Sequence, residues 1–463
     1  MNLPFIWIIL PVLLAAVSLL IRDRKTLFIT VLAVLSLALS VVAFVLSFQH
    51  SGSTAALTSQ ETFSVLGRSL MVRYRDLPLI GSIYFLSFFW IISLIFYESN
   101  EYLPAFCVIY AALNIASFSI DPFLYSVLII FLANGLYLPV LSTGSFARIS
   151  GRLRFLLYQL ISIFLILLAG WILAGGEIAP VESDQLFFST LLLGFGMAIW
   201  LGIFPFHTWI PLLSEEVAFL PFGYMLTILP LSGILLLLKF LNDFAWLREY
   251  AAFFLALQYL GAVMIILGGL GAFFQKSLPR LLAFIMMTGI GMLLCGVGFI
   301  PTASTDLVAA WIVPFFAGTW ALSFGFAGLN QSSGIQTIEG LKGKFYVRPM
   351  ASILMLVGVL TLVGFPLTSG FSSNLLMLSA AWNANQGIAV AVLISQLLIL
   401  ATFVRLLLRM TLREGKKITI PEKVDLNQLL ILLALLMNLI PGIFPSIIYN
   451  QLFAIIGEIF PLL

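Results

Sequence analysis

The chain has 463 residues, of which 62% are hydrophobic and only 9% are charged, and its formal net charge is +3. So little charge on so long a chain excludes a soluble globular protein, and the small net charge gives no basis for nucleic-acid binding. The sequence therefore predicts an all-α polytopic membrane protein.

Apolar runs of about 20 residues, the length that crosses a bilayer, recur along the whole chain. The first run carries its positive charges, Arg22, Arg24 and Lys25, after its apolar part, which is typical of a first span and not of a cleavable signal. We predict about fourteen spans, near residues 4–21, 26–47, 78–97, 102–119, 123–142, 154–175, 186–204, 222–241, 250–274, 279–300, 305–330, 349–378, 385–410 and 427–446. The longest polar stretch, residues 48–77, is too short for a domain.

The basic residues predict an orientation, because loops rich in Lys and Arg face the cytoplasm. With alternating spans, most of the 22 basic residues fall in loops on one side. The other side holds only Arg68, Arg73, Arg75, Lys239 and Arg248. We therefore predict a bacterial-type inner membrane, or an equivalent one, with both termini on the non-cytoplasmic side.

The remaining features of composition exclude several kinds of site. Cys107 and Cys295 both lie in apolar runs, so we expect buried thiols. No CxxC, HExxH, P-loop or GxGxxG after a strand occurs, so we predict no metal and no cofactor. The segment after Pro441 is too polar for an easy span, and we expect it to lie along the membrane interface.

Two of the predicted spans are interrupted by helix breakers. The first, LLLGFGMAIWLGIFPFHTWIPLLSEE (191–216), contains Pro205, and the second, TLVGFPLTSGFSSNLLM (361–377), contains Gly364, Pro366 and Gly370. Proline removes a helix hydrogen bond, and in lipid such a break persists only where it is buried in protein or faces a wet cavity. Interrupted spans in the two halves of a membrane protein indicate repeats around a transport path.

Four segments in order, FLANGLYLPVL (131–141), GIFPFHTWIP (202–211), QKSLPRLLAF (275–284) and TLVGFPLTSGF (361–371), carry a resemblance. They resemble motifs of the antiporter-like subunits of respiratory complex I, a family shared with Mrp-type cation/proton antiporters and membrane-bound hydrogenases. The resemblance covers about residues 100–410. It implies fourteen helices with two inverted five-helix repeats, the seventh and twelfth helices being broken. It divides the chain into residues 1–100 (three helices), 101–241 (first repeat), 250–410 (second repeat) and 411–463 (last helix and interfacial tail).

The departures from the family pattern concern its proton path, a line of ionisable residues near the middle of the membrane. Such residues are costly in lipid and are normally functional. Aligned on the motifs, this chain has a degenerate path of neutral residues at those positions: Asn134 in place of a glutamate, Trp200 and Pro230 in place of lysines, Gly289 in place of a histidine or glutamine, and Asn374 in place of a lysine or glutamate. Pro279 also replaces a lysine of the family, while Arg280 matches. No acidic residue lies at the centre of a span, and among the basic residues only Arg405 lies inside one.

The other polar groups in the spans are neutral, and they allow two interpretations. They bond to helix backbones freed by the breaks, which we favour, or they line a wet cavity without titratable relays. His207 is likewise either a proton gate facing Glu215 and Glu216 or a hydrogen-bonded residue that holds the turn. We favour the second role, because nothing deeper could accept its proton. Glu215 and Glu216 are then expected to be a solvated or interfacial pair.

The function implied by the resemblance is that of a non-catalytic subunit of a complex I-like or hydrogenase-like assembly. Its proton path would be lost and its role structural. The implied partners are other membrane and peripheral subunits of a redox complex, and lipid, but no nucleic acid. The alternative is an Mrp-type or stand-alone transporter with a neutral-lined cavity, and a weaker third possibility is a proton channel that uses water and hydroxyl groups alone.

Overall fold

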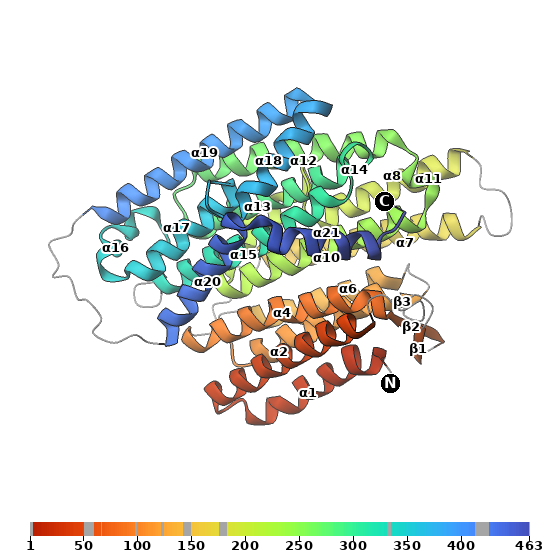
Figure 1. The fold of residues 1–463 in the computed structure, drawn as a ribbon, viewed down its shortest axis with the longest axis horizontal. Coiled ribbons are helices and arrows are strands. Elements are labelled where there is room, and N and C mark those ends of the chain that lie inside the picture. Colours follow the sequence, from red (N-terminus) through yellow and green to blue (C-terminus); the bar gives the residue numbers. More distant parts are fainter. Residues whose placement is uncertain are drawn as a thin grey trace. The chain divides into compact units, whose positions relative to one another are not determined.

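The computed structural model describes residues 3–50, 60–65, 67–97, 100–121, 125–141, 150–175, 183–330, 335–412 and 426–462. These residues are mostly helical and divide into two compact units, Met1–Trp200 (unit 1) and Leu201–Leu463 (unit 2) (Figure 1). Some of the basic residues used to predict the orientation lie outside the described residues, namely Arg148, Arg413, Lys416, Lys417 and Lys423.

Unit 1 contains a bundle of helices and one small sheet. Its helices are α1 (Leu10–Ser18), α2 (Lys25–His50), α4 (Leu77–Ser93), α5 (Leu103–Ser119), α6 (Ser126–Tyr137), α7 (Ser150–Gly175) and α8 (Ser183–Trp200), with a π-helical turn at Phe5–Ile9 before α1. The strands are β1 (Gln60–Val65), β2 (Arg68–Arg73) and β3 (Ile120–Asp121).

Unit 2 is helical throughout its described residues. Its longer helices are α10 (Phe219–Asp243), α12 (Ala251–Phe274), α13 (Leu278–Gly298), α15 (Asp306–Asn330), α17 (Pro349–Val363), α18 (Gly370–Ala384), α19 (Gln386–Thr411), α20 (Leu426–Ile443) and α21 (Pro445–Ile459). The shorter ones are α9 (Trp209–Glu216), α11 (Ala245–Arg248), α14 (Ile300–Ala303) and α16 (Lys344–Val347).

The predicted spans fall on helices of the right character. In the described part of the chain, nine helices are long and apolar enough to cross a membrane, and five further apolar helices are shorter. Each predicted range coincides with one of these, the range 349–378 being divided between α17 and α18. Within these helices, acidic residues occur only in the first or last turn, so the described span interiors carry no carboxylate.

The polar stretch near residues 48–77 forms structure that the sequence did not predict. β1 and β2 pair as an antiparallel hairpin, and β3 adds to β2; Figure 1 shows this sheet at one end of the unit 1 helices. Gly67, with φ of +75°, supplies the left-handed residue of the turn. The Arg68 guanidinium lies 4.0 Å from the centroid of the Tyr125 ring and also donates to its hydroxyl. The described part of the stretch therefore contains a small antiparallel hairpin.

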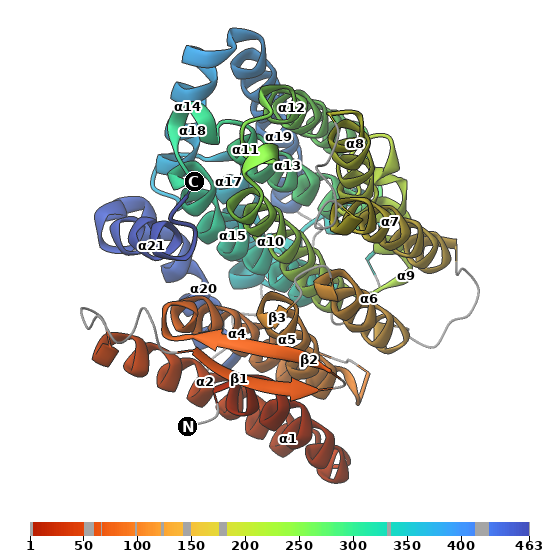
Figure 2. The same ribbon diagram turned by 90° about the vertical axis from the view of Figure 1, so that its right-hand side faces the viewer.

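The core of unit 2 consists of α10, α13 and α15, which are almost completely buried (Figure 2). Small residues allow α12 and α13 to approach closely, since a Cβ on Gly291 would lie 2.8 Å from the Gly261 carbonyl oxygen. Close backbone approach of this kind is the usual way in which helices associate where no hydrophobic force drives them together. Cys295 is a buried free thiol in this core, and Cys107 is its counterpart in unit 1, as expected.

Both predicted helix interruptions are present. α8 ends at Trp200, before Pro205, because Gly202 adopts a left-handed φ of +66°, and helix resumes at α9. α17 ends at Val363 and is followed by Gly364, with φ of +78°, and helix resumes at α18. The first break thus begins five residues earlier than the proline that predicted it.

Two other predictions of organisation are not decided by this arrangement. The compact units divide at residues 200 and 201, inside the first predicted repeat of 101–241, but a repeat is a different kind of division from a contact unit. The segment after Pro441 forms helix α21, in which Tyr449 is buried while Asn450 and Glu458 are exposed. An interfacial position for this helix stays a prediction.

Candidate functional site

A chain of buried polar side chains in unit 1 includes the first predicted path residue. The Tyr110 hydroxyl donates to Asn134 Oδ1 at 2.8 Å, and the Asn134 amide donates to Gln159 Oε1 at 3.2 Å. Gln159 Nε2 donates in turn to the main-chain oxygen of Trp200 at 3.2 Å. All of these side chains are buried. The chain of contacts therefore links α5, α6, α7 and the last residue of α8.

This network joins helices and offers no position where a proton would reside. Carboxamides do not titrate near neutral pH, and both the oxygen and the nitrogen of Gln159 are already engaged. The same holds for Asn134. In a medium of low dielectric constant a satisfied network is stabilising, whereas a broken one leaves costly unpaired groups. Asn134, at the predicted path position, is thus an amide whose hydrogen bonds join helices.

Trp200 fills the predicted lysine position with a ring that is only 2% exposed. Its indole N–H has no hydrogen-bond partner among the described residues. One turn before Trp200, α7 packs closely against α8. The Ser162 hydroxyl donates to the Gly196 oxygen at 2.8 Å, and a Cβ on Gly196 would lie 2.6 Å from Ile166 Cγ1. The side of α8 that faces α7 is closely packed at this level.

Gly289, the predicted site of a polar residue in the central helix, is buried against an aromatic ring. A Cβ at this position would lie 2.5 Å from Cδ2 and 2.7 Å from Cε2 of Phe315. Real side chains do not tolerate such distances without a shift of the neighbour. The space that a histidine or glutamine would need is therefore taken by Phe315, whose side chain is completely buried.

Pro230 lies inside the fully buried helix α10. One turn earlier, the Thr227 hydroxyl donates to the Gly223 oxygen at 2.7 Å. It also forms a hydrogen bond of 2.9 Å with the Thr319 hydroxyl, in which either oxygen can be the donor. Thr319 also bonds to the Phe315 oxygen in its own helix, at 2.6 Å. These hydroxyls join α10 to α15 through neutral contacts.

Asn374, the last predicted path residue, satisfies the broken end of α17. Its amide donates to the Val363 carbonyl oxygen at 3.3 Å, and its Oδ1 accepts from Gln396 Nε2 at 2.5 Å. The last carbonyls of a helix have no partner in the helix itself. Asn374 supplies one, and its side chain lies so close to Gly364 that a Cβ there would be 2.6 Å away.

A second set of neutral contacts fixes the same break to the C-terminal helices. The Thr361 hydroxyl donates to Asn438 Oδ1 at 2.7 Å, and the Ser369 N–H donates to the Asn438 main-chain oxygen at 2.7 Å. The Tyr449 hydroxyl donates to the Ser369 oxygen at 2.6 Å and lies 3.2 Å from Ser373 Oγ. The side chains of Asn374 and Tyr449 thus bond to backbone groups at the break, which favours the first of the two interpretations given above.

His207 sits in the short 3₁₀ turn Phe206–Thr208, outside the helices that are long or apolar enough to span. Its ring stacks on Phe204 with centroids 5.9 Å apart, and its Nδ1 has no hydrogen-bond partner among the described residues. Burial lowers the pKa of His207 below its ordinary value. The imidazole is therefore neutral at pH 7, and ring packing holds it where a hydrogen bond was expected.

Glu215, predicted to form a solvated or interfacial pair with Glu216, contacts Arg280. Nη2 of Arg280 donates to Glu215 Oε2 at 2.9 Å, and Nε lies 2.7 Å from Oε1 without the alignment of a hydrogen bond. The Ser277 hydroxyl adds a weaker contact to Oε1 at 3.4 Å. The pair is 22% exposed on Glu215 and 38% on Arg280, so it is partly solvated. It ties α9, just after the first break, to the start of α13.

Arg405, the one basic residue predicted inside a span, binds the end of a neighbouring helix. Its guanidinium donates to the carbonyl oxygens of Phe273, Ala272 and Gln275 at 2.7, 3.1 and 3.1 Å. Positive charge is favourable at the C-terminus of a helix, where the carbonyls are unpaired. Arg405 thus acts as a cap for α12.

Sequence reasoning missed the partners that define these sites. Tyr110, Gln159, Gln396 and Asn438 are polar residues inside predicted spans, and that polarity was the only available signal. No group of three or more His, Cys, Asp and Glu side chains suited to a metal ion occurs in the described parts of the chain.

The family model described as "NADH:quinone oxidoreductase/Mrp antiporter, TM" matches residues 82–399. NADH-quinone oxidoreductase subunit N of Psychrobacter arcticus is 29% identical over 233 residues, which cover 49% of this chain and 47% of the relative. The chain spans less than half the length of the first curated relatives that it matches.

Two solved structures share the fold over nearly the whole chain. A chain of the Mrp complex from Dietzia sp. DQ12-45-1b superposes with a TM-score of 0.81 at 15% identity. The superposition covers 100% of this chain and 98% of the Mrp chain. A chain of respiratory complex I from Thermus thermophilus with bound NADH gives a TM-score of 0.77 at 20% identity, with 99% and 98% covered. At these identities the likeness establishes the fold alone.

Proposed function

Because this chain belongs to the NADH:quinone oxidoreductase/Mrp antiporter transmembrane family, we propose that it is an antiporter-like membrane-arm subunit of a complex I-like, proton-translocating assembly. We further propose that it lacks a working proton path and acts structurally. Its partners would be other membrane and peripheral subunits of a redox complex. It would itself be a non-catalytic subunit of an NADH:quinone oxidoreductase-like or hydrogenase-like enzyme.

The observation that carries this proposal is the engagement of both carboxamides at the expected path positions. Asn134 bonds to Tyr110 and Gln159, and Asn374 bonds to a helix end and to Gln396. A redox-driven pump moves protons by changing the charge of groups in the membrane. Neutral amides whose hydrogen bonds hold helices together do not provide such a change.

The fine architecture proposed for the chain follows the family. Fourteen spans, with breaks in the seventh and twelfth, accommodate the nine long and five shorter apolar helices of the described chain. The two inverted repeats would cover residues 101–241 and 250–410, and both termini would face the non-cytoplasmic side. Support for this orientation comes from the basic residues of the loops.

The test is to purify the tagged full-length chain with everything that it retains and to reconstitute that assembly in vesicles. We expect Tyr110→Phe and His207→Ala to leave the number of protons moved per electron unchanged, because neither residue would relay a proton. Loss of most pumping with all subunits still present would overturn the proposal. Gly457→Ala, a change on the exposed face of α21, controls for handling of the variants.

The alternative function, an Mrp-type or stand-alone transporter, predicts a different result. The chain would then be isolated without redox subunits and would move cations across vesicles by itself. That outcome would replace the subunit proposal.

A further inference from the structure

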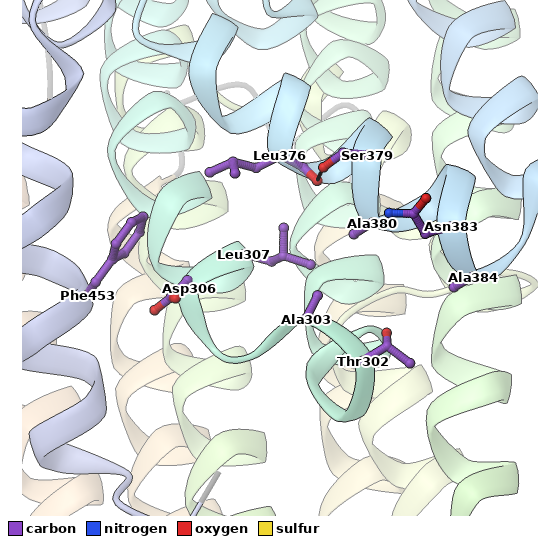
Figure 3. A pocket seen from close by; sticks show the side chains of 10 residues that line it. All are labelled: Thr302, Ala303, Asp306, Leu307, Leu376, Ser379, Ala380, Asn383, Ala384 and Phe453. Atoms are coloured by element: carbon purple, nitrogen blue, oxygen red, sulfur yellow. Dashed lines mark hydrogen bonds between the residues drawn. The ribbon is translucent and has the colours of Figure 1, made fainter.

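A pocket of about 340 Å³ lies in unit 2, away from both helix breaks. Figure 3 shows it between the α14–α15 junction, the second half of α18, and Phe453 of α21. α15 begins and α18 ends beside it, so the pocket lies at the ends of apolar helices. If these helices cross the membrane, the pocket lies at its surface.

The hydroxyl groups of the lining act as acceptors toward the pocket. The Thr302 hydroxyl donates to the Phe299 carbonyl oxygen at 3.0 Å, and the Ser379 hydroxyl donates to the Leu376 oxygen at 2.8 Å. Each hydroxyl has one hydrogen and two lone pairs. Since both hydrogens are engaged within their own helical segments, only lone pairs are left for a ligand.

Asp306 is the one charged residue that lines the pocket. Its carboxylate lies in the first turn of α15, where the helix N-terminus favours a negative charge. Within the described residues, neither Asp306 nor Asn383 has a side-chain hydrogen bond or an ion pair to another side chain. A carboxylate that faces a pocket lined by acceptors lacks a cationic partner.

The apolar wall of the pocket includes an aromatic ring. Leu307, Leu376 and Phe453 line it, and Phe453 is held by stacking on Tyr449 at 6.2 Å between centroids. Figure 3 shows the Phe453 ring and Asp306 among the residues of the lining. An aromatic face beside a carboxylate attracts ammonium groups through both charge and the ring quadrupole. The lining contains no basic group, so an isolated anion would have no cationic partner in it.

We propose that this pocket binds a primary ammonium group whose attached carbon chain lies on the apolar wall. The N–H donors of an ammonium suit a carboxylate such as that of Asp306, and the hydroxyl lone pairs offer further acceptors along the pocket. Two sources share this chemistry: the headgroup of an aminophospholipid and a soluble primary amine. The site does not depend on the ion path, so its failure would leave the proposed function untouched.

The test compares full-length protein in nanodiscs of phosphatidylcholine with and without phosphatidylethanolamine. Native mass spectrometry counts the retained lipid, and thermal unfolding reports its stabilising effect. We expect phosphatidylethanolamine to be retained preferentially, since the quaternary ammonium of phosphatidylcholine has no N–H. Asp306→Asn should weaken this retention about tenfold, or about 1.4 kcal/mol. Asp184→Asn, which removes a carboxylate from the first turn of α8 and not from the pocket, should not.

Three further results decide the proposal and its source. Stabilisation by ethanolamine in solution equal to that by the lipid would assign the site to a soluble amine. A larger effect of the lipid would assign it to the headgroup. If the Asp306→Asn variant does not fold, the variant Asn383→Ala, at the exposed end of α18, is tested in its place. We again expect weaker retention of phosphatidylethanolamine. Equal retention of both lipids by the wild type, with no effect of ethanolamine, would overturn the proposal.

Discussion

Gly289→Ala offers the most direct test of whether the central path position is closed by packing. The added methyl would lie 2.5 and 2.7 Å from two ring atoms of Phe315, and both residues are buried in the core of unit 2. Overpacking of this kind costs about 1–3 kcal/mol. The better helix propensity of alanine offsets up to about 1 kcal/mol. We therefore expect a net loss of about 1–2 kcal/mol.

The assay is thermal unfolding of the purified chain in a fixed detergent, with Gly457→Ala as the matched control. Position 457 also lies in a helix of unit 2, but a Cβ there has nothing within 4 Å. The control should be unchanged or slightly stabilised, because it gains helix propensity without a clash.

Removing the opposing ring should rescue the variant. Phe315→Leu alone is expected to destabilise through lost packing, yet the double variant should lose clearly less than the sum of the two single losses. If the losses simply add, or if Gly289→Ala behaves like the control, Phe315 does not fill the position. A histidine or glutamine could then be accommodated at residue 289.

Three further predictions concern the polar contacts. Gln159→Leu should cost about 1–3 kcal/mol in thermal unfolding, because it leaves the Asn134 amide without its acceptor; an unchanged melting temperature would contradict this network. Glu215→Gln and Arg280→Met should each destabilise by up to about 1 kcal/mol, with a coupling in the double variant that weakens at high salt; simple additivity would rule out the pair. Burial lowers the pKa of His207, so as the pH falls the imidazole of the unfolded chain is protonated before that of the folded chain. The contribution of His207 to stability should therefore be complete above about pH 6.5 and fall below it. His207→Phe should flatten this fall, and an identical pH profile would contradict it.

Hydropathy was sufficient to predict most of the helical framework. All fourteen predicted ranges fall on apolar helices, since the burial of about 20 apolar residues in lipid is a local property of the chain. Gly364 and Pro366 likewise marked the second break within a residue or two. The hairpin at β1 and β2 escaped prediction because its strands are short and its surroundings polar.

The hydrogen-bond and packing partners of the site residues could not be predicted from the sequence. Glu215 and Arg280 are 65 residues apart, and nothing in either local segment selects one for the other. Asn374 bonds to Gln396 across two helices, and the direction of each bond depends on side-chain geometry. Phe315 as the occupant of the space beside Gly289 depends on how α13 packs against α15. Such choices are made by packing in three dimensions and leave no periodic pattern.

The retention of broken helices without ionisable residues has a physical explanation in these contacts. A break frees backbone groups that must find partners inside the membrane. Here the Asn374 side chain donates to the Val363 oxygen, and the main-chain oxygen of Asn438 accepts from the Ser369 N–H. A side chain that also relayed protons would have to release its backbone partner in one state, which costs about 1–3 kcal/mol for each unpaired group. A charged lysine or glutamate can offset that cost by a change of protonation, whereas a neutral amide cannot. If the proton path is lost as we propose, the amide that stabilises the second break is also a group unsuited to carrying protons.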